Sequence, residues 1–445
     1  MAAIDKSIYE KFIIESADGS KNADIKEGVV AFTYFENIFS PYLTARVIVI
    51  NTSGAIEGED GNSQSIYNGL PLRGGERVLI KIAGNSEENN GLDFSKDPTQ
   101  YFYVASITNV LLDEGSESFT LNLVSREAIT NETTRVGKKF PTSQKISGSV
   151  KDILKNYLHA DKVGEIEETQ NTYGFIGNLK KPFSIITWLA SKSVSGKAKP
   201  GEDSSAGYVF FETQEGFNFM SIDKIMESKP YDKDFVYKPG VISSDDPNKD
   251  FKILTYATNR NQDLIGKLER GAYSSVRYYV NPVSFVPTIS VFNAKDYQGK
   301  ANNLGDREIM LPKIDDKSDK TLGDLPSRIF VGMLDVGTLE KDASDEGWND
   351  PVKRNADPTR IHSQSMMRYN QIFTQVIDIQ IPLNTNLTAG SIIRCVFPQL
   401  SKVKRKQPDP EISGLYMIKE LAHYFDGNGS YTKLKIVRDS FGRKW

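Results

Sequence analysis

The order of apolar and polar residues divides the chain into two strand-rich end regions and a middle region of mixed character. In Phe119–Leu123 every second residue is apolar, which predicts a strand with one buried face. Short segments rich in β-branched and aromatic residues recur between turn-rich stretches. The N-terminal strands expected from this pattern are Val29–Phe35, Tyr42–Asn51, Glu76–Ile82, Tyr101–Leu112 and Ser118–Val124.

The apolar spacing becomes helical after residue 146. A helix is predicted over Ser147–Leu158, where Val150, Ile153 and Leu154 share one face. A second helix is predicted over Phe183–Ser193. Pro182 suits its first turn, and Trp188 is expected in its buried stripe.

Extended segments resume beyond these helices. Tyr208–Thr213 and Gly216–Met220 are predicted to form a β-hairpin, because Gln214–Gly216 separates two apolar runs. Residues 250–370 show the weakest pattern, with an extended segment expected at Tyr273–Phe292 and a short helix at Arg360–Tyr369. Long loops are expected over the polar stretches Asn302–Asp324 and Leu339–Pro358.

Regular alternation returns near the C-terminus. The expected strands there are Gln371–Pro382, Ser391–Phe397, Gly414–Leu421 and Tyr431–Asp439. Asp426–Gly429 is a strong tight-turn sequence between the last two.

These patterns predict a mainly β chain with an α+β insert, in which two tube-like antiparallel β-barrel domains flank a helix-containing middle region. The expected domains are residues 1–130 for the first barrel, 131–207 for the helical insert, 208–245 for hairpin strands that complete the first barrel, 246–368 for an irregular mixed domain with long loops, and 369–445 for the second barrel.

Composition narrows the function classes. Of the 445 residues, 38% are hydrophobic and 25% are charged, which favours folded cores over disorder. The formal net charge of -3 does not predict tight nucleic-acid binding. The single cysteine, Cys395, allows no internal disulfide and favours synthesis in a cytosol. No signal peptide is expected, and no apolar run approaches the ~20 residues that a membrane span needs.

The sequence contains no motif that carries known chemistry. It lacks a phosphate loop, a nucleophile elbow and a zinc-binding helix, and its histidines, His159, His362 and His423, lie far apart. We expect no catalytic residues, no metal site and no cofactor, and therefore no enzymatic activity. His423 is expected to be a packed or hydrogen-bonded structural residue.

One sharp basic cluster lies between two of the expected C-terminal strands and contains Lys402, Lys404, Arg405 and Lys406. Two interpretations stay open: an exposed hairpin tip, or a contact with an acidic partner or with passing DNA.

Several stretches together resemble the central hub family of contractile phage-tail baseplates. The strongest is Gly414–Phe425, which contains His423 and is followed after a turn by Tyr431–Asp439. It is similar to the last barrel hairpin of hub proteins. The other matching stretches are Ser125–Ala128 with the helix after it, Asn178–Phe183 continuing through Trp188–Ala190, and Tyr208–Glu212, which resemble the hubs of T-even-like and cyanophage myoviruses.

The resemblance implies a homotrimer in which two tube-like domains per chain give a pseudo-six-fold ring. Such a ring would join a six-fold tail tube, or its initiator protein, to a three-fold central spike and would contact baseplate wedge proteins. It would sit in the tail baseplate of a virion and let genomic DNA pass without specific binding. Lys433, Lys435 and Asp439 are candidate channel-facing residues, although an outer wet face fits the same pattern.

Other functions remain open at this point. The chain could be the hub of a secretion or extracellular contractile injection system. A tail-associated cell-wall hydrolase would need an acid or nucleophile cleft, and a receptor-binding protein would need exposed aromatic platforms.

Overall fold

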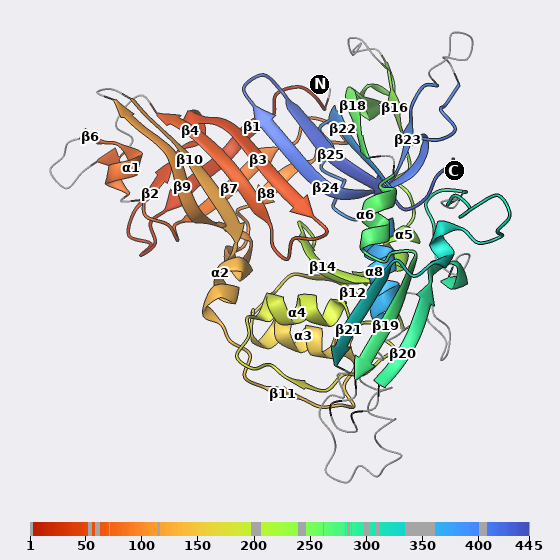
Figure 1. Cartoon of the computed structure of the whole chain (residues 1–445). Coiled ribbons are helices and arrows are strands. Elements are labelled where there is room, and N and C mark those ends of the chain that lie inside the picture. Colours follow the sequence, from red (N-terminus) through yellow and green to blue (C-terminus); the bar gives the residue numbers. More distant parts are fainter. Residues whose placement is uncertain are drawn as a thin grey trace.

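The computed structural model describes residues 3–51, 56–57, 63–70, 72–113, 116–196, 206–238, 246–260, 262–280, 282, 285, 287–297, 302–307, 311–333, 361–399 and 407–444. Strands predominate, and helices cluster between the two strand-rich ends of the chain (Figure 1). The expected class, mainly β with helices, is confirmed.

The N-terminal unit contains the strands that alternation predicted, together with shorter ones. Its elements are β1 (Ile8–Glu15), β2 (Asn22–Asp24), η1 (Lys26–Gly28), β3 (Val29–Asn37), β4 (Thr44–Asn51), β5 (Ile56–Glu57), β6 (Ser63–Gln64), α1 (Ile66–Gly69), β7 (Arg77–Ala83), β8 (Gly91–Phe94), η2 (Pro98–Gln100), β9 (Phe102–Asp113) and β10 (Ser116–Ser125).

The C-terminal unit combines the last four strands with three strands from the middle of the chain. Its elements are β16 (Asp234–Tyr237), η3 (Lys249–Phe251), β17 (Lys252–Ile253), β18 (Thr255–Arg260), β22 (Gln375–Pro382), β23 (Ile392–Val396), β24 (Gly414–Asp426) and β25 (Ser430–Arg438). The strands follow one another around a shared core: β24 pairs with β23, β23 with β16, β16 with β17, and, beyond Leu254, β18 with β22, β22 with β25 and β25 with β24.

The two units are joined edge to edge. Strand β24 pairs antiparallel with β3 over seven residue pairs, from Glu420–Asn37 to Asp426–Ala31, so both ends of the chain belong to one 15-stranded sheet. Among the described residues no ladder connects β1 to β3, so the N-terminal unit is open on that side. The two strand-rich ends that the sequence predicted are therefore paired with each other in one sheet.

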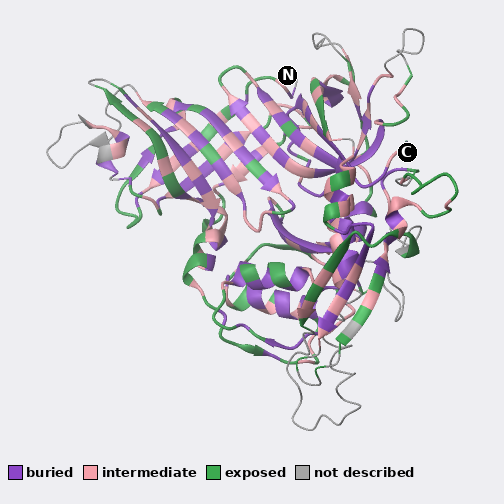
Figure 2. Ribbon diagram, in the orientation of Figure 1, coloured by how far each residue is buried: buried purple, intermediate pink, exposed green. Residues whose placement is uncertain are grey.

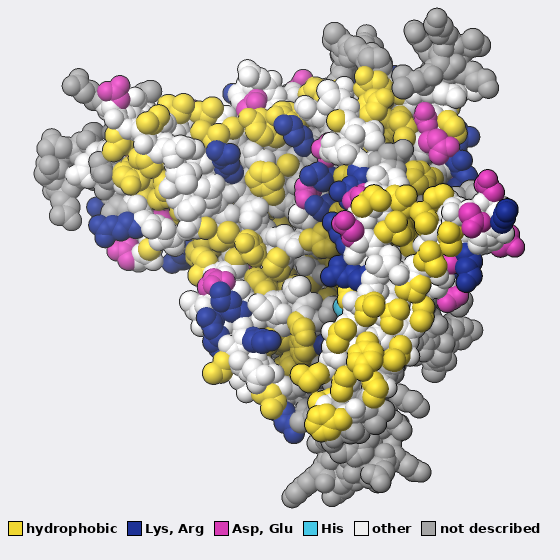
Figure 3. All heavy atoms as spheres, viewed as in Figure 1, with side chains coloured by type: hydrophobic (Ala, Val, Ile, Leu, Met, Phe, Trp, Pro, Cys, Tyr) yellow, Lys and Arg dark blue, Asp and Glu magenta, His cyan; other side chains and the backbone are white. Residues whose placement is uncertain are grey.

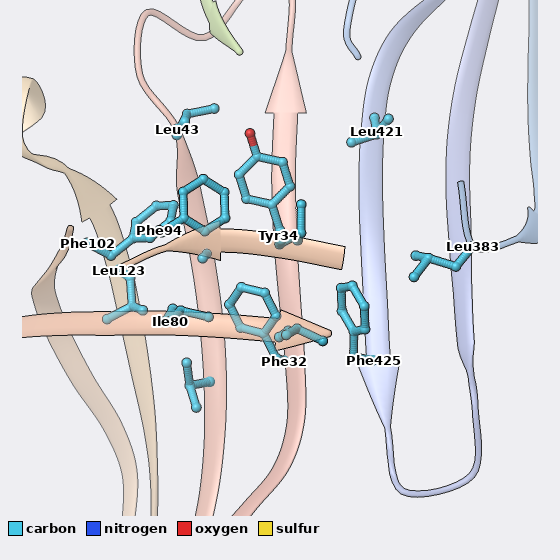
Figure 4. Close-up of a cluster of buried hydrophobic side chains, with 14 of the residues drawn as sticks. Phe32, Tyr34, Leu43, Ile80, Phe94, Phe102, Leu123, Leu383, Leu421 and Phe425 are labelled. Carbon is cyan, nitrogen blue, oxygen red and sulfur yellow. The ribbon is translucent and has the colours of Figure 1, made fainter. Parts of the chain in front are cut away.

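One core lies behind this joined sheet. Phe32 of β3 and Phe425 of β24 are fully buried, with ring centroids 5.9 Å apart (Figure 4). The same cluster continues from Phe12 and Ile80 in the N-terminal unit to Ile381 and Ile436 in the C-terminal unit. Burial alternates along the strands in a chequered pattern, as a sheet with one buried face requires (Figure 2).

The insert has a core of its own. Its elements are α2 (Arg126–Thr133), β11 (Lys139–Phe140), α3 (Ile146–Asn156), β12 (Val163–Ile166), β13 (Phe175–Ile176), α4 (Pro182–Ala190), β14 (Tyr208–Thr213), β15 (Gly216–Ser221) and α5 (Ile222–Met226). Both predicted helices are present. Trp188, however, is 36% exposed rather than fully buried, since it lies edge-on against Tyr173 and Phe175 at the surface.

The β14–β15 hairpin was expected to complete the first barrel, but it pairs with β12 in a separate three-stranded sheet. Phe210 and Phe217 of this hairpin pack against Phe183 of α4, so its apolar residues are buried by helices instead.

Part of the region expected to be irregular is ordered. It contains α6 (Leu264–Glu269), β19 (Ser274–Val280), β20 (Pro287–Asn293), η4 (Ala294–Tyr297), η5 (Leu322–Asp324), β21 (Arg328–Met333) and α8 (Ile361–Gln371). The three strands form a small sheet in the order β20-β19-β21. The helix α8 confirms the short helix predicted at Arg360–Tyr369.

Candidate functional site

Eight strands of the large sheet, each hydrogen-bonded to the next, form one antiparallel path that crosses both units. Its order is β18-β22-β25-β24-β3-β4-β10-β9, and every neighbouring pair is antiparallel. Because eight is even, the two outermost strands, β18 and β9, run in opposite directions.

Both outer strands have an edge without a partner strand. Within the described residues β18 pairs with β22 alone, and β9 pairs with β10 on one side while β7 reaches only Phe102 and Tyr103 on the other. From Ala105 to Leu112 the outer edge of β9 therefore has no neighbouring strand in the described chain. Such an edge presents unpaired N–H and C=O groups that can accept another strand.

The solvent face of this path carries cross-strand rows that the registers fix. One row contains Ala257, Asp378, Lys435, Glu420 and Asn37. The next contains Thr255, Gln380, Lys433, Ala422, Phe35 and Thr44. The third contains Tyr431, Tyr424, Thr33, Arg46, Asn122 and Ser106.

Glu420 is the centre of a charge network in the first row. Its carboxylate accepts a hydrogen bond from Asn37 Nδ2 at 3.0 Å, lies 3.2 Å from Lys435 Nζ and also pairs with Lys419. Partial burial acts to raise the pKa of Glu420, but the hydrogen bonds and charges of Lys419 and Lys435 outweigh it, so the pKa is lowered. Positive and negative groups are thus matched in this row.

A shallow groove of about 740 Å³ runs over the middle of the face. Strands β18, β22, β25, β24 and β3 contribute to its walls, with Lys433 and Lys435 among the lining residues. The solvent face of the sheet is therefore concave where the two units meet.

The predicted site residues separate into three groups. Lys433 and Lys435 lie on the solvent face, in adjacent rows. Asp439 does not share that face: it is buried, its carboxylate lies 3.2 Å from Arg368 Nη1, and it accepts a hydrogen bond from the Leu304 amide. The basic cluster of Lys402, Lys404, Arg405 and Lys406 lies outside the described residues.

Two buried carboxylates behind the face were missed by sequence reasoning. Glu36 accepts hydrogen bonds from Tyr34 Oη at 2.7 Å, from the Gln214 amide at 2.8 Å and from the Ala389 amide at 2.7 Å. Burial raises the pKa of Glu36 to about 7. Glu36 falls at an inward position of β3, two residues after Tyr34, so the alternation of that strand was a signal that could have located it.

Glu212 has the same role on the neighbouring strand β14. It accepts hydrogen bonds from the Leu43 amide at 2.9 Å and from Ser125 Oγ at 2.7 Å, and burial raises its pKa to about 8. Together the two carboxylates fasten the insert to the back of the large sheet.

The histidines form no cluster. His423 is buried, stacks on Tyr34 and lies 2.9 Å from Thr432 Oγ1, so it has the structural role expected of it. Burial lowers its pKa to about 3. The part of the chain that the structure describes contains no group of three or more histidine, cysteine or acidic side chains able to hold a metal ion. None of its helices is long and apolar enough to cross a membrane.

Comparison with known proteins shows a sequence related to this chain. No family model matches the sequence. The chain is 24% identical over 301 residues to the probable baseplate hub protein gp334 of Vibrio phage KVP40, and the match covers 66% of each protein. The chain is a relative of a phage baseplate hub protein. The resemblance inferred from the motifs around Gly414–Phe425 is therefore confirmed.

Two solved structures are similar to this chain in fold. The 43 kDa tail protein of prophage MuSo2 from Shewanella oneidensis has a TM-score of 0.51 and 8% identity, covering 97% of this chain and 99% of its own. A tail protein from Neisseria meningitidis MC58 has a TM-score of 0.52 and 8% identity, covering 96% of both chains. The fold of this chain is thus similar to that of the two tail proteins along almost its whole length.

Proposed function

We propose that this protein is a structural subunit of a tail baseplate hub, in which three copies join into a ring through the edges β9 and β18. The proposal is supported by the relationship to a hub protein and rests on one observation: an eight-stranded antiparallel sheet with two unpaired, oppositely directed edges. It requires no catalytic group.

The strand directions suit a ring. Rotation about an axis parallel to the strands keeps each strand's direction, so β9 of one copy meets β18 of the next with opposite direction. Antiparallel pairing can then continue from copy to copy without a break, and closure removes both exposed edges of the eight-stranded path. An odd number of strands would place like-directed edges together.

The solvent face is the proposed lining of a central channel. Lys435 lies between Glu420 and Asp378 in its row, so its charge is largely cancelled at short range, while Lys433 lies between the uncharged Gln380 and Ala422 in the next row. A channel that passes DNA needs such a surface, because a continuous basic lining would hold the phosphates. The two ends of the ring are the proposed contacts for a tail tube and for a central spike.

Two measurements on the purified full-length chain test this proposal. Light scattering should give the mass of three chains. Hydrogen exchange should show protection of Ala105–Leu112 and Thr255–Arg260 that increases with protein concentration, because these edge amides gain partners only on assembly.

Strand β8 supplies an internal control. It is also an edge strand, since within the described part of the chain it pairs with β7 alone, but it is not a strand of the path and its exchange should not depend on concentration. A mass of one chain at all concentrations, or unchanged exchange in β9 and β18, would contradict the ring. A structural role also predicts that the protein leaves peptidoglycan intact in a zymogram.

A further inference from the structure

Among the described residues, no element covers the outer face of the small sheet β20-β19-β21, which is apolar. The registers arrange nine residues in three rows across the strands. The rows are Val291, Val276 and Ile329; Ile289, Tyr278 and Val331; and Pro287, Val280 and Met333. Hydrophobic side chains gather over these strands at the lower right of Figure 3.

The exposure of this face is unusual for its chemistry. Val331 and Met333 are each 73% exposed, Ile329 is 66% exposed, and Ile289 and Val291 are 63% and 64% exposed. None of the nine residues is charged. Soluble proteins rarely leave a contiguous apolar patch of this kind bare unless it binds something.

The opposite face of the same sheet is already covered. Arg277 and Tyr279 point to that side, where both reach His362 of α8, and Phe292 is buried there too. The sheet is therefore held by α8 on that side and presents its apolar face outward.

The proposed ring needs more contact area than its strand edges supply. A paired edge as long as Ala105–Leu112 is roughly 25 Å long and 5 Å wide. Each partner of a stable interface buries about 800 Å². A ring would therefore need further contact surface beside its edges, and the small sheet is connected to the β18 edge through α6, the next helix after β18 in the chain.

An exposed apolar loop, which contains Leu179, lies on the β9 side of the molecule. Leu179 is 67% exposed in a loop where Asn178 and Leu179 both have positive φ, at 50° and 55°. A non-glycine residue in the left-handed region of φ costs about 1 kcal/mol or more. The loop therefore holds an apolar side chain in solvent in a strained backbone conformation. Ile176, three residues earlier, is 50% exposed.

The topology puts this loop at the β9 end of the molecule. The start of α4 is fastened to α2, which follows β10, through the hydrogen bond from the Phe183 amide to Asn131 Oδ1 and through the pair of Lys181 with Glu132. The end of α4 lies instead beside α8, where Ser365 Oγ reaches the Ser191 carbonyl.

Strands β10 and β18 are six positions apart in the antiparallel path, so they run in the same direction. The helices that follow them, α2 and α6, therefore begin at the same end of the sheet. Figure 1 shows both helices below the large sheet. When β9 of one copy meets β18 of the next, the loop of Leu179 and the small sheet come to the same side of the same junction.

We propose that the apolar face of β19, β20 and β21 is the docking surface for a second copy of this chain, whose Leu179 loop packs against the row of Ile289, Tyr278 and Val331. The inference rests on the proposed ring and adds its second contact.

Cysteine cross-linking tests the contact directly. One protein carries Val331→Cys and another carries Leu179→Cys, and the two are mixed, allowed to assemble and treated with copper phenanthroline as oxidant. A covalent dimer is expected from the mixture and not from either protein alone. The native Cys395 is fully buried and does not interfere.

A charge substitution gives an independent measurement. Val331→Asp should weaken self-association by about tenfold or more, because it buries a carboxylate without a partner. Ile8→Asp is the matched control: Ile8 is 66% exposed on β1, away from both edges, and the variant should assemble like the wild type.

The outcomes separate the two proposals. If the wild type and Val331→Asp form equally stable trimers and the cysteines do not cross-link, the docking surface is wrong and the ring stands. If the wild type is a monomer at all concentrations, the ring itself is wrong and this contact falls with it.

Discussion

At the residue scale, Arg368 shows how buried charge holds separate parts of the chain together. Its guanidinium is 2% exposed and lies 2.6 Å from Asp223 and 3.2 Å from Asp439. Replacing it by methionine leaves two buried carboxylates without their cation and should lower the free energy of unfolding by about 3–5 kcal/mol. Urea unfolding measures this loss.

The Arg394–Asp234 pair is a control of equal length. Its atoms are also 2.6 Å apart, but the two side chains are 26% and 44% exposed. Solvent screens such a pair, so Arg394→Met should cost less than about 1 kcal/mol. Equal losses in the two variants would mean that burial of Arg368 does not set its contribution.

Glu36 makes stability depend on pH. Its pKa rises from 4.5 to about 7 in the folded chain, so folded protein holds this proton more tightly than unfolded protein. The resulting stabilisation is complete below pH 4.5 and is lost as pH rises to about 7. The loss is on the order of 3 kcal/mol.

Glu36→Gln should remove this share of the pH dependence. Thermal unfolding of both proteins between pH 4.5 and 8 is the measurement. Glu212, whose pKa is raised mainly by burial and to a smaller extent by the charge of Glu36, is present in both proteins, so most of its contribution is common to the two profiles. Parallel profiles would show that the Glu36 carboxylate does not titrate in this range.

At the scale of elements, two glycine-containing turns that the sequence predicted differ in how closely other backbone atoms approach the glycine. Gly216 closes the β14–β15 hairpin at φ +123°, and a Cβ there would lie 2.7 Å from the Lys162 carbonyl oxygen. Gly216→Ala should cost about 1–3 kcal/mol. Gly427→Ala, where nothing lies within 4 Å, should change stability by less than about 0.5 kcal/mol. Denaturant titration compares them, and equal costs would contradict the close approach.

This contrast shows which features the sequence could predict and which it could not. Local signals located the hairpin at Gly216 and the helices α3 and α4, because alternation and helical spacing depend on residues near one another. They could not assign β14–β15 to a sheet with β12, because pairing depends on which distant strand covers the apolar face. The same limit hid the partners of Glu36, whose acceptor role needs the Ala389 amide from the far end of the chain.

At the scale of the whole molecule, the C-terminal hairpin was predicted from its alternation, but its union with the N-terminal unit was not. The β24–β3 ladder joins residues almost 400 positions apart, beyond the reach of any local pattern. Alternation within one strand was enough to place Lys433 and Lys435 on the same face. It could not show that Asp439, at the end of the strand, is buried against Arg368. Whether that face lines a channel stays a prediction.

The shared core implies that the two chain ends unfold together. Phe425 belongs to the C-terminal unit, yet its ring packs on Phe32 of the N-terminal unit. Phe425→Ala should therefore cost about 3–5 kcal/mol and speed hydrogen exchange in β3 and β4 as much as in β25. Phe140→Ala is the matched substitution in the separate core of the insert, and it should speed exchange in β13 and α3 first. If Phe425→Ala affected the C-terminal strands alone, the ends would be independent domains that merely touch. A hub assembled from such ends could flex at the β3–β24 seam, whereas a common core makes each chain one rigid segment of the proposed ring.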